Sequence, residues 1–236
     1  MKVTLIDYNQ NAVEKLIFCK NTRLLISASN MDEVSAMSIE DKMEALEYIA
    51  NTIKSSWEFL DFTFMVEGVS RAFTHQFVRN RMGSYAQQTM RILDVSGFDY
   101  VTGPSILTDD QNELYHGTMA TIAAAYDELI KSGVKIEDAR GILPTNICTN
   151  IVVKYNLRTL SDMMASRSSS RTQGEFREVI DAMYEEVIKV MPWLHMFLRD
   201  KKTMAANQLE SIILSDYEGT DQCTPYIKLI DILRNK

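Results

Sequence analysis

Alternating and helically spaced hydrophobic positions predict a few strands and many helices in this chain. Residues 2–7 (KVTLID) and 59–67 (FLDFTFMVE) alternate apolar and polar side chains, wholly or in part, and each is predicted to be a strand. After Ser38, apolar side chains recur at helical spacing as far as Ile53, and Asp41 stands three residues on as a capping-box partner. This segment is therefore predicted to be a helix.

The middle of the chain combines helical spacing with turn-forming residues. Ser70 can cap a helix that runs to about Met82 and is broken by Gly83, and residues 86–93 are predicted to be a strand or an extended segment. Further helices are predicted over residues 11–19, 109–133, 136–142, 146–167 and 172–190. The β-branched start of 146–167 is ambiguous between helix and strand. We expect the C-terminal third to be helical as well.

These elements indicate a single α+β domain over residues 1–236, rich in helices, with a small mixed or antiparallel sheet. The chain length of 236 residues fits one large domain. Neither a repeat of fixed period nor a Pro/Gly/Ser-rich linker divides the sequence.

Composition argues against several classes of protein. Hydrophobic residues make up 46% and charged residues 24% of the chain, as in globular proteins. No run approaches the ~20 apolar residues of a membrane span, and the N-terminus does not read as a signal peptide. We therefore expect a cytoplasmic protein (in a host's cytoplasm if it is viral) with no membrane partner. Three scattered cysteines and three scattered histidines predict neither a disulfide framework nor a metal site.

The arginines are unevenly distributed. The net charge of −7 argues against binding to nucleic acid, yet residues 68–93 contain no acid and four arginines: Arg71, Arg79, Arg81 and Arg91. A second cluster contains Arg158, Arg167, Arg171 and Arg177. The planar guanidinium group suits phosphate and carboxylate. A pocket for a small anionic ligand and a set of surface arginines paired with acids both remain open on this evidence.

Residues 79–91 read RNRMGSYAQQTMR, an unusual combination of arginines, amides and a Gly-Ser pair. On a helix, Arg79 and Arg81 would point about 200° apart and would face different ligands. The following Gln87, Gln88 and Thr89 supply neutral donors and acceptors that can read a base edge or a sugar hydroxyl.

The spacing Arg79-x-Arg81, seven residues, Thr89-x-Arg91 resembles the signature of the flavin-dependent thymidylate synthase family. Residues 140–144 (RGILP), 156–177 and 55–58 (SSWE) resemble further segments of that family. The resemblance implies transfer of a one-carbon unit from methylene-tetrahydrofolate to C5 of dUMP, giving dTMP. It also implies FAD as cofactor, NADPH as reductant, and a homotetramer with its sites at subunit interfaces.

The resemblance implies two sets of site residues and no metal. The nucleotide site would comprise Gln76, Arg79, Gln87, Gln88, Thr89, Met90, Arg91, Arg140 and Arg167. The flavin site would comprise Ser55, Glu58, Arg79, Asn80, Arg81, Asn156, Arg158, Asp162 and Arg171. Arg167 would be the catalytic residue that contacts and polarises the pyrimidine, whereas Arg91 and Arg140 would anchor phosphate or sugar.

The sequence departs from the family pattern mainly on the flavin side. Asn80 replaces a histidine, Ile53 stands where histidine is common, and Asp162 stands where an amide or histidine is usual. Asp162 would place a negative charge near a phosphate-bearing cofactor unless Arg171 offsets it. These departures leave three alternatives: dTMP synthesis, an altered C5 chemistry such as hydroxymethylation of dUMP, and a nucleotide-binding protein without catalysis.

Overall fold

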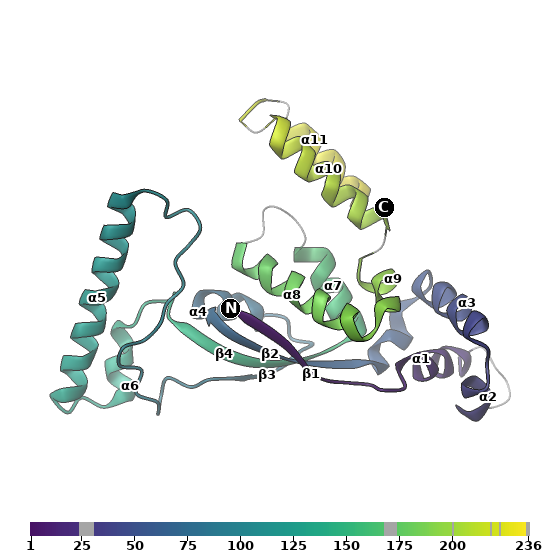
Figure 1. The fold of residues 1–236 in the computed structure, drawn as a ribbon, viewed down its shortest axis with the longest axis horizontal. Coiled ribbons are helices and arrows are strands. Elements are labelled where there is room, and N and C mark those ends of the chain that lie inside the picture. Colours follow the sequence, from purple (N-terminus) through teal and green to yellow (C-terminus); the bar gives the residue numbers. More distant parts are fainter. Residues whose placement is uncertain (24–30, 168–173, 200, 218, 222, 235–236) are drawn as a thin grey trace. The chain divides into compact units, whose positions relative to one another are not determined.

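The computed structural model contains one antiparallel sheet and many helices (Figure 1). It describes residues 1–23, 31–167, 174–199, 201–217, 219–221 and 223–234. The strands, in their order across the sheet, are β1 (Lys2–Tyr8), β2 (Asp61–Ser70), β4 (Cys148–Asn156) and β3 (Ser84–Gln87). Arg71 N–H donates to Ile147 O at one end of the β2–β4 pair, and Leu157 N–H to Leu60 O at the other. The two strands therefore run in opposite directions, and the predicted α+β class is confirmed.

The chain divides into two compact units. The first comprises residues 1–4 and 65–153, and the second comprises residues 5–64 and 154–236. Strands β1, β2 and β4 each contribute residues to both units. Because three strands continue through the division, we keep the single domain over residues 1–236 as a proposal.

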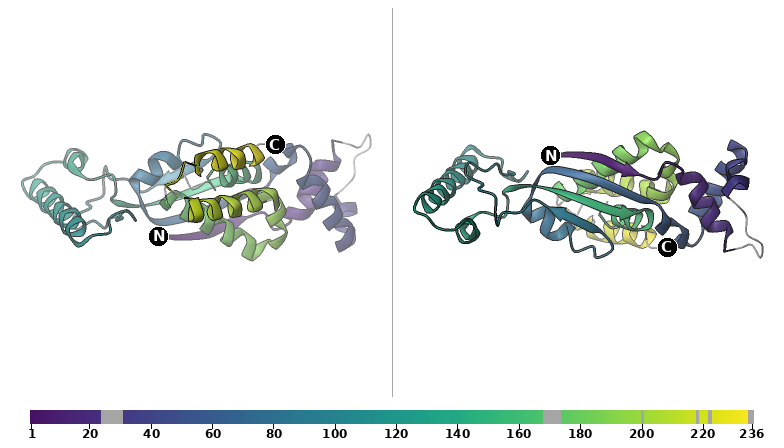
Figure 2. Two further views of the ribbon diagram at one scale, coloured as in Figure 1. Left: turned by 90° about the horizontal axis from the view of Figure 1, so that it is seen from above. Right: turned by 90° about the horizontal axis from the view of Figure 1, so that it is seen from below.

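Helices dominate the second unit. They are α1 (Ala12–Asn21), α2 (Met31–Ser35), α3 (Ile39–Ala50), η1 (Lys54–Phe59), α7 (Leu157–Arg167), α8 (Gly174–Val190), η3 (Pro192–Leu194), α9 (His195–Leu198), α10 (Lys201–Tyr217) and α11 (Cys223–Arg234). The side chain of Ser38 accepts a hydrogen bond from Asp41 N–H at 3.0 Å, so the predicted helix start is confirmed. Figure 2 shows α10 and α11 side by side, in agreement with their mutual contacts.

A buried apolar core fixes η1 against α7 in the second unit. Trp57 of η1 is 2% exposed, and its ring packs edge-on against Phe197 at 5.0 Å between centroids. Leu157 and Leu160 of α7 are fully buried. Burial of such large side chains contributes about 1.5–3 kcal/mol each. This core therefore fixes η1 and α7, the two elements that carry the charged residues described below.

The helices of the first unit lie between its strands in sequence. Its helices are α4 (Arg71–Phe77), α5 (Asp109–Lys131), α6 (Ile136–Ala139) and η2 (Arg140–Ile142). Thr108 and Gln111 form a reciprocal capping box at the start of α5, and Gly133 takes the left-handed φ of 88° just beyond its end. Phe73 and Phe77 of α4 are fully buried, so this short helix is anchored through one face.

The predicted helix after Ser70 is shorter than expected. Ser70 caps it as predicted, accepting from Phe73 N–H at 3.0 Å, but the helix ends at Phe77 and not near Met82. Beyond it the chain turns, and Gly83 N–H bonds Asn80 O. The prediction that Arg79 and Arg81 diverge along a helix is therefore wrong, because both lie in this turn.

Three further predictions require correction. Residues 146–167 were expected to be mostly helical, but their first half forms β4, because Ile151 and Val153 pack into the core between neighbouring strands. Helix α3 ends at Ala50, and Ile53 is 61% exposed beyond it. Residues 86–93 were predicted to be a strand or an extended segment, and the strand observed there, β3, ends at Gln87. The predicted cap Thr172 lies outside the described residues. Within the described part of the chain, no helix is long and apolar enough to cross a membrane.

Candidate functional site

Gln87 and Gln88, both predicted to bind nucleotide, are held in place by neighbouring residues of the first unit. The Gln87 side-chain Nε2 donates to Thr74 Oγ1 at 2.9 Å and lies 3.5 Å from Thr149 Oγ1, and both threonines are buried. Gln88 N–H donates to Asn150 O at 2.9 Å, extending the pairing beyond β3. The segment that carries these two residues is therefore fixed by hydrogen bonds to the sheet and to α4.

Arg71, at the start of α4, adds a further constraint on this segment. Its Nη2 donates to Gln88 O at 2.6 Å, whereas its buried Nε has no partner among the described residues. Burial, with a smaller contribution from the charge of Arg140, lowers the pKa of Arg71 below its usual range. Arg71 was not among the predicted site residues, although the acid-free segment 68–93 that contains it was a signal.

Arg91 and Arg140 complete a group that we call the arginine cluster, together with Arg71. Arg91 Nε lies 3.3 Å from Glu137 Oε2, and Arg140 Nε donates to Glu137 O at 3.1 Å. Among the ion pairs of the described residues, the pair of Arg91 with Glu137 is the one that involves any of these three arginines. The arginine cluster therefore keeps an excess of positive charge, which suits a phosphate group.

The remaining candidates of the first unit lie in exposed turns. Asn80 Oδ1 accepts from Met82 N–H at 3.1 Å, so Asn80 stabilises the turn that presents Arg79 and Arg81. Thr89 Oγ1 accepts from Arg91 N–H at 3.1 Å and thereby shapes the segment that carries Met90 and Arg91. Gln76 is exposed on α4.

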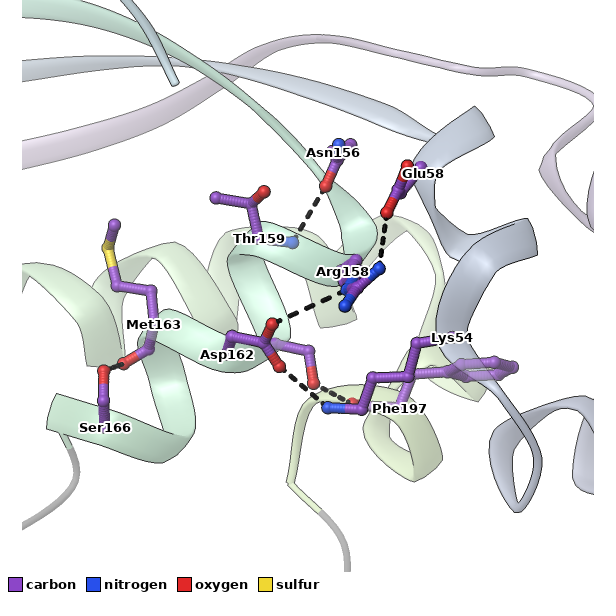
Figure 3. A network of polar contacts seen from close by, with 10 residues as sticks. Lys54, Glu58, Asn156, Arg158, Thr159, Asp162, Met163, Ser166 and Phe197 are labelled. Atoms are coloured by element: carbon purple, nitrogen blue, oxygen red, sulfur yellow. Dashed lines mark hydrogen bonds and ion pairs between the residues drawn. The ribbon is translucent and has the colours of Figure 1, made fainter. Parts of the chain in front are cut away.

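In the second unit, four charged side chains form a chain of ion pairs that we call the charge network (Figure 3). Arg158 Nη1 lies 2.6 Å from Glu58 Oε1, and its Nε lies 3.9 Å from Asp162 Oδ2. Lys54 Nζ lies 2.8 Å from Asp162 Oδ1. Asp162 therefore has two cationic partners. We expected Arg171 to offset the negative charge of Asp162. Lys54 and Arg158 balance this charge instead, and Arg171 lies outside the described residues.

A cavity of about 550 Å³ lies beside the charge network. Its lining comprises Arg23, Thr52, Ile53, Lys54, Ser55, Arg158 and Asp162. Arg23 Nη1 donates to Ser55 Oγ at 2.7 Å. Three of the predicted flavin residues thus meet in one cavity, whereas Arg23 and Lys54 were missed because they carry no recognisable motif.

Asn156 and Arg167 lie at the two ends of α7. Asn156 Oδ1 accepts from Thr159 N–H at 2.8 Å, which caps the helix that presents Arg158 and Asp162 (Figure 3). The guanidinium of Arg167, at the last position of α7, stacks 4.7 Å from the centroid of the Phe176 ring. Its predicted catalytic role stays a prediction.

The two predicted sets of residues divide largely between the two units. The nucleotide set lies in the first unit except for Arg167, and the flavin set lies in the second except for residues 79–81 and the undescribed Arg171. Among the described residues, no group of histidine, cysteine, aspartate and glutamate side chains is arranged to hold a metal ion.

Comparison with known proteins gives consistent matches over most of the chain. The family described as "Thymidylate synthase complementing protein" matches residues 4–193. A flavin-dependent thymidylate synthase of Clostridium tetani is 32% identical over 216 residues, covering 84% of this chain and 86% of the relative. One of Pyrococcus furiosus is 34% identical over 200 residues and covers 80% of each, and one of Sulfolobus acidocaldarius is 30% identical over 228 residues, 93% of this chain and 86% of the relative.

Proposed function

The chain belongs to the family of flavin-dependent thymidylate synthases, and from this membership we propose that it transfers a one-carbon unit to C5 of dUMP, giving dTMP. The carbon donor is methylene-tetrahydrofolate, and NADPH is the reductant. The observation that carries the proposal is the arginine cluster of Arg71, Arg91 and Arg140, in which only Arg91 pairs with a described acid, Glu137.

The arginine cluster supplies the anchor for the nucleotide. Arg91 and Arg140 bind its phosphate or sugar. The Gln87 amide, fixed by Thr74, and the side chain of Gln88, whose backbone is fixed by Asn150, read polar groups of the nucleotide. We assign Thr89 to substrate binding and not to nucleophilic attack; the hydrogen bond that its hydroxyl oxygen accepts from Arg91 N–H holds it beside Arg91.

The cavity beside the charge network fits part of a phosphate-bearing dinucleotide. Its lining combines the cations of Arg23, Lys54 and Arg158 with the hydroxyl groups of Thr52 and Ser55, which are donors suited to a diphosphate. Its volume lies within the range of small-molecule sites. Ser55, Glu58, Asn156, Arg158 and Asp162 would hold FAD on this side. The predicted flavin residues Arg79, Asn80 and Arg81 belong to the first unit, and their contact with FAD stays a prediction. When bound, FAD supplies the hydride that reduces the transferred carbon.

Arg167 provides electrostatic assistance in this proposal. Its guanidinium contacts the pyrimidine and stabilises the negative charge that develops when the ring is activated. Because an arginine acts here as a fixed cation, the reaction needs no protein nucleophile. Stacking on Phe176 limits the orientations that the Arg167 side chain can adopt.

The proposal extends to assembly and location. We propose a cytoplasmic homotetramer whose subunits share sites, on the strength of the resemblance in the two arginine-containing segments. Light scattering on the purified, FAD-loaded protein tests the assembly, and a monomer with full activity would contradict shared sites.

A single-turnover experiment tests the proposed reaction. The FAD-loaded protein is treated with NADPH without oxygen until the absorbance of oxidised flavin disappears. Then dUMP and methylene-tetrahydrofolate are added, one at a time or together. We expect the absorbance to return only when both are present. A return with either compound alone, or no return with both, would contradict the proposed chemistry.

A matched pair of variants tests the nucleotide site. Replacing Arg91 or Arg140 with alanine should weaken dUMP binding by about 1.5–3 kcal/mol, the value of a hydrogen bond to a charged group. Arg177→Ala, an exposed arginine on α8, is the control and should bind dUMP as the wild type does. Unchanged affinity in both cluster variants would sink the site assignment.

A further inference from the structure

Asp162 is an anomaly in a cavity proposed to bind phosphate. A carboxylate on the wall repels a phosphate group, and the Asp162 side chain is 53% exposed at the cavity beside Arg158 and Lys54. The segment of the chain that carries Lys54 is separated from Asp162 by 108 residues. The fold therefore brings a specific counter-ion to this carboxylate.

Lys54 is held in one place by two contacts. Its Nζ pairs with Asp162 Oδ1 at 2.8 Å and lies 5.0 Å from the centroid of the Trp57 ring. Trp57 is buried in the core, so it gives the ammonium group a fixed support. The ammonium group faces the same cavity as Arg158 and Ser55.

The charge of the cavity depends on this lysine. Arg158 also pairs with Glu58, so Arg23, Lys54 and Arg158 oppose the two carboxylates of Glu58 and Asp162. The balance is one positive charge with Lys54 and zero without it. An anionic ligand that covers the cavity also excludes water from the Lys54–Asp162 pair. With less screening by water, the attraction between the ligand and the excess positive charge of the cavity becomes stronger.

We infer that Lys54 is a cofactor-binding residue of this chain, which neutralises Asp162 and makes the cavity able to hold the diphosphate of FAD. The inference rests on the proposed function of the cavity. Lys54 contacts the diphosphate or its bound water directly, while Asp162 sets the direction of the lysine side chain. Asp162 and Lys54 act as a pair, so the effect of replacing one of them on the affinity for FAD depends on whether the other is present.

The pair contributes little to folding, which makes the inference testable. Lys54 and Asp162 are 41% and 53% exposed, and exposed pairs stabilise proteins by about 0–1 kcal/mol. A substitution at Lys54 therefore leaves the fold intact, and a loss of cofactor binding reports the site itself.

The experiment compares three variants of the full chain: Lys54→Met, Asp162→Asn and the double variant. The affinity for FAD is measured from the quenching of flavin fluorescence, and the thermal midpoint is measured in parallel. Lys189→Met is the control, because Lys189 is an exposed lysine that pairs with Glu186, three residues before it on α8. We expect Lys54→Met to weaken FAD binding about 10- to 100-fold. The double variant should recover part of this loss, because it removes the unbalanced carboxylate but does not restore the contact made by Lys54.

The outcomes separate the inference from the proposed function. Wild-type FAD affinity in Lys54→Met, or a double variant that binds no better than Lys54→Met, would overturn the inference alone. A wild-type protein that fails to bind FAD would contradict the proposed function, and the inference with it. If Lys54→Met and the control Lys189→Met lost the same affinity for FAD, the effect would be one of overall charge, and the proposed role of Lys54 would be overturned.

Discussion

The arginine cluster of the first unit and the charge network of the second are built in different ways. In the arginine cluster, Arg71 and Arg140 donate to main-chain oxygens of Gln88 and Glu137. In the charge network, exposed side chains pair with one another: Lys54 with Asp162, and Arg158 with Glu58. The first arrangement ties charged residues to the backbone, whereas the second balances charge at a surface.

Because of this difference, substitutions in the two groups should cost different amounts of folding free energy. A buried donor or acceptor that loses its partner costs more than the net value of the bond, because the remaining group stays desolvated. An exposed ion pair exchanges its partner for water at little cost. In the arginine cluster only Arg71 is partly buried, so its replacement should disturb stability and binding together. Replacement of the exposed Arg91 or Arg140, or of residues of the charge network, should mainly alter binding.

The largest expected effect is that of Arg71→Met. This change removes the charged donor to Gln88 O, and the free energy of unfolding should fall by about 1.5–3 kcal/mol. The affinity for dUMP should fall as well, because the segment carrying Gln87 and Gln88 loses a constraint. Urea unfolding and dUMP titration measure the two effects, with Arg177→Met as the control. Equal stability of the two variants would break the comparison between the clusters.

Thr74→Val should have a smaller effect of the same kind. Thr74 is fully buried, and its hydroxyl group accepts from Gln87 Nε2 at 2.9 Å. Its loss should destabilise the protein by about 0.5–1.5 kcal/mol and weaken dUMP binding. Thr118→Val is a matched control, because Thr118 is exposed and bonds only a carbonyl within α5 among the described contacts. Chemical unfolding that places both variants at wild-type stability would argue against anchoring of Gln87.

Glu58→Gln tests the opposite side of the comparison. Glu58 pairs with Arg158 at 2.6 Å, but their side chains are 43% and 48% exposed. The free energy of unfolding should change by only about 0.2–1 kcal/mol, whereas the affinity for FAD should change, because Glu58 is among the residues proposed to hold FAD. A thermal midpoint that falls as far as that of Arg71→Met would show that the charge network is also part of the folding core.

The smallest expected effect concerns Lys20 of α1, a buried cation in the second unit. Burial, with a smaller contribution from Arg23, lowers the pKa of Lys20 in the folded protein. Between this lowered pKa and the ordinary lysine value, the unfolded chain binds more protons, so stability rises with pH over that window. Lys20→Met should lose this rise. Parallel stability curves for the two proteins over the alkaline range would contradict the burial effect.

Local signals made part of this fold predictable. The caps at Ser38 and Ser70 and the long helix α5 depend on residues close in sequence, and the structure has them where the pattern placed them. Strand β4 was interpreted as helix because its β-branched residues gain their preference from neighbouring strands, which are remote in sequence.

The same limit applies to the candidate sites. Recognition of the motifs identified Ser55, Arg158 and Asp162, which meet in one cavity. It missed Arg23 and Lys54, because their proximity to Asp162 arises only when α1, η1 and α7 pack together. It also missed Arg71, whose contact with the carbonyl of Gln88 depends on the turn between α4 and β3.

The mass of the nucleotide product tests the proposed function most directly. The protein is incubated with FAD, NADPH, methylene-tetrahydrofolate and dUMP, and the nucleotides are analysed by mass spectrometry. We predict a product that has gained one methyl group. Because Lys54 neutralises Asp162, this carboxylate should not prevent FAD from binding. A hydroxymethyl product, or unchanged dUMP beside a protein that retains its flavin, would contradict thymidylate synthesis by this chain.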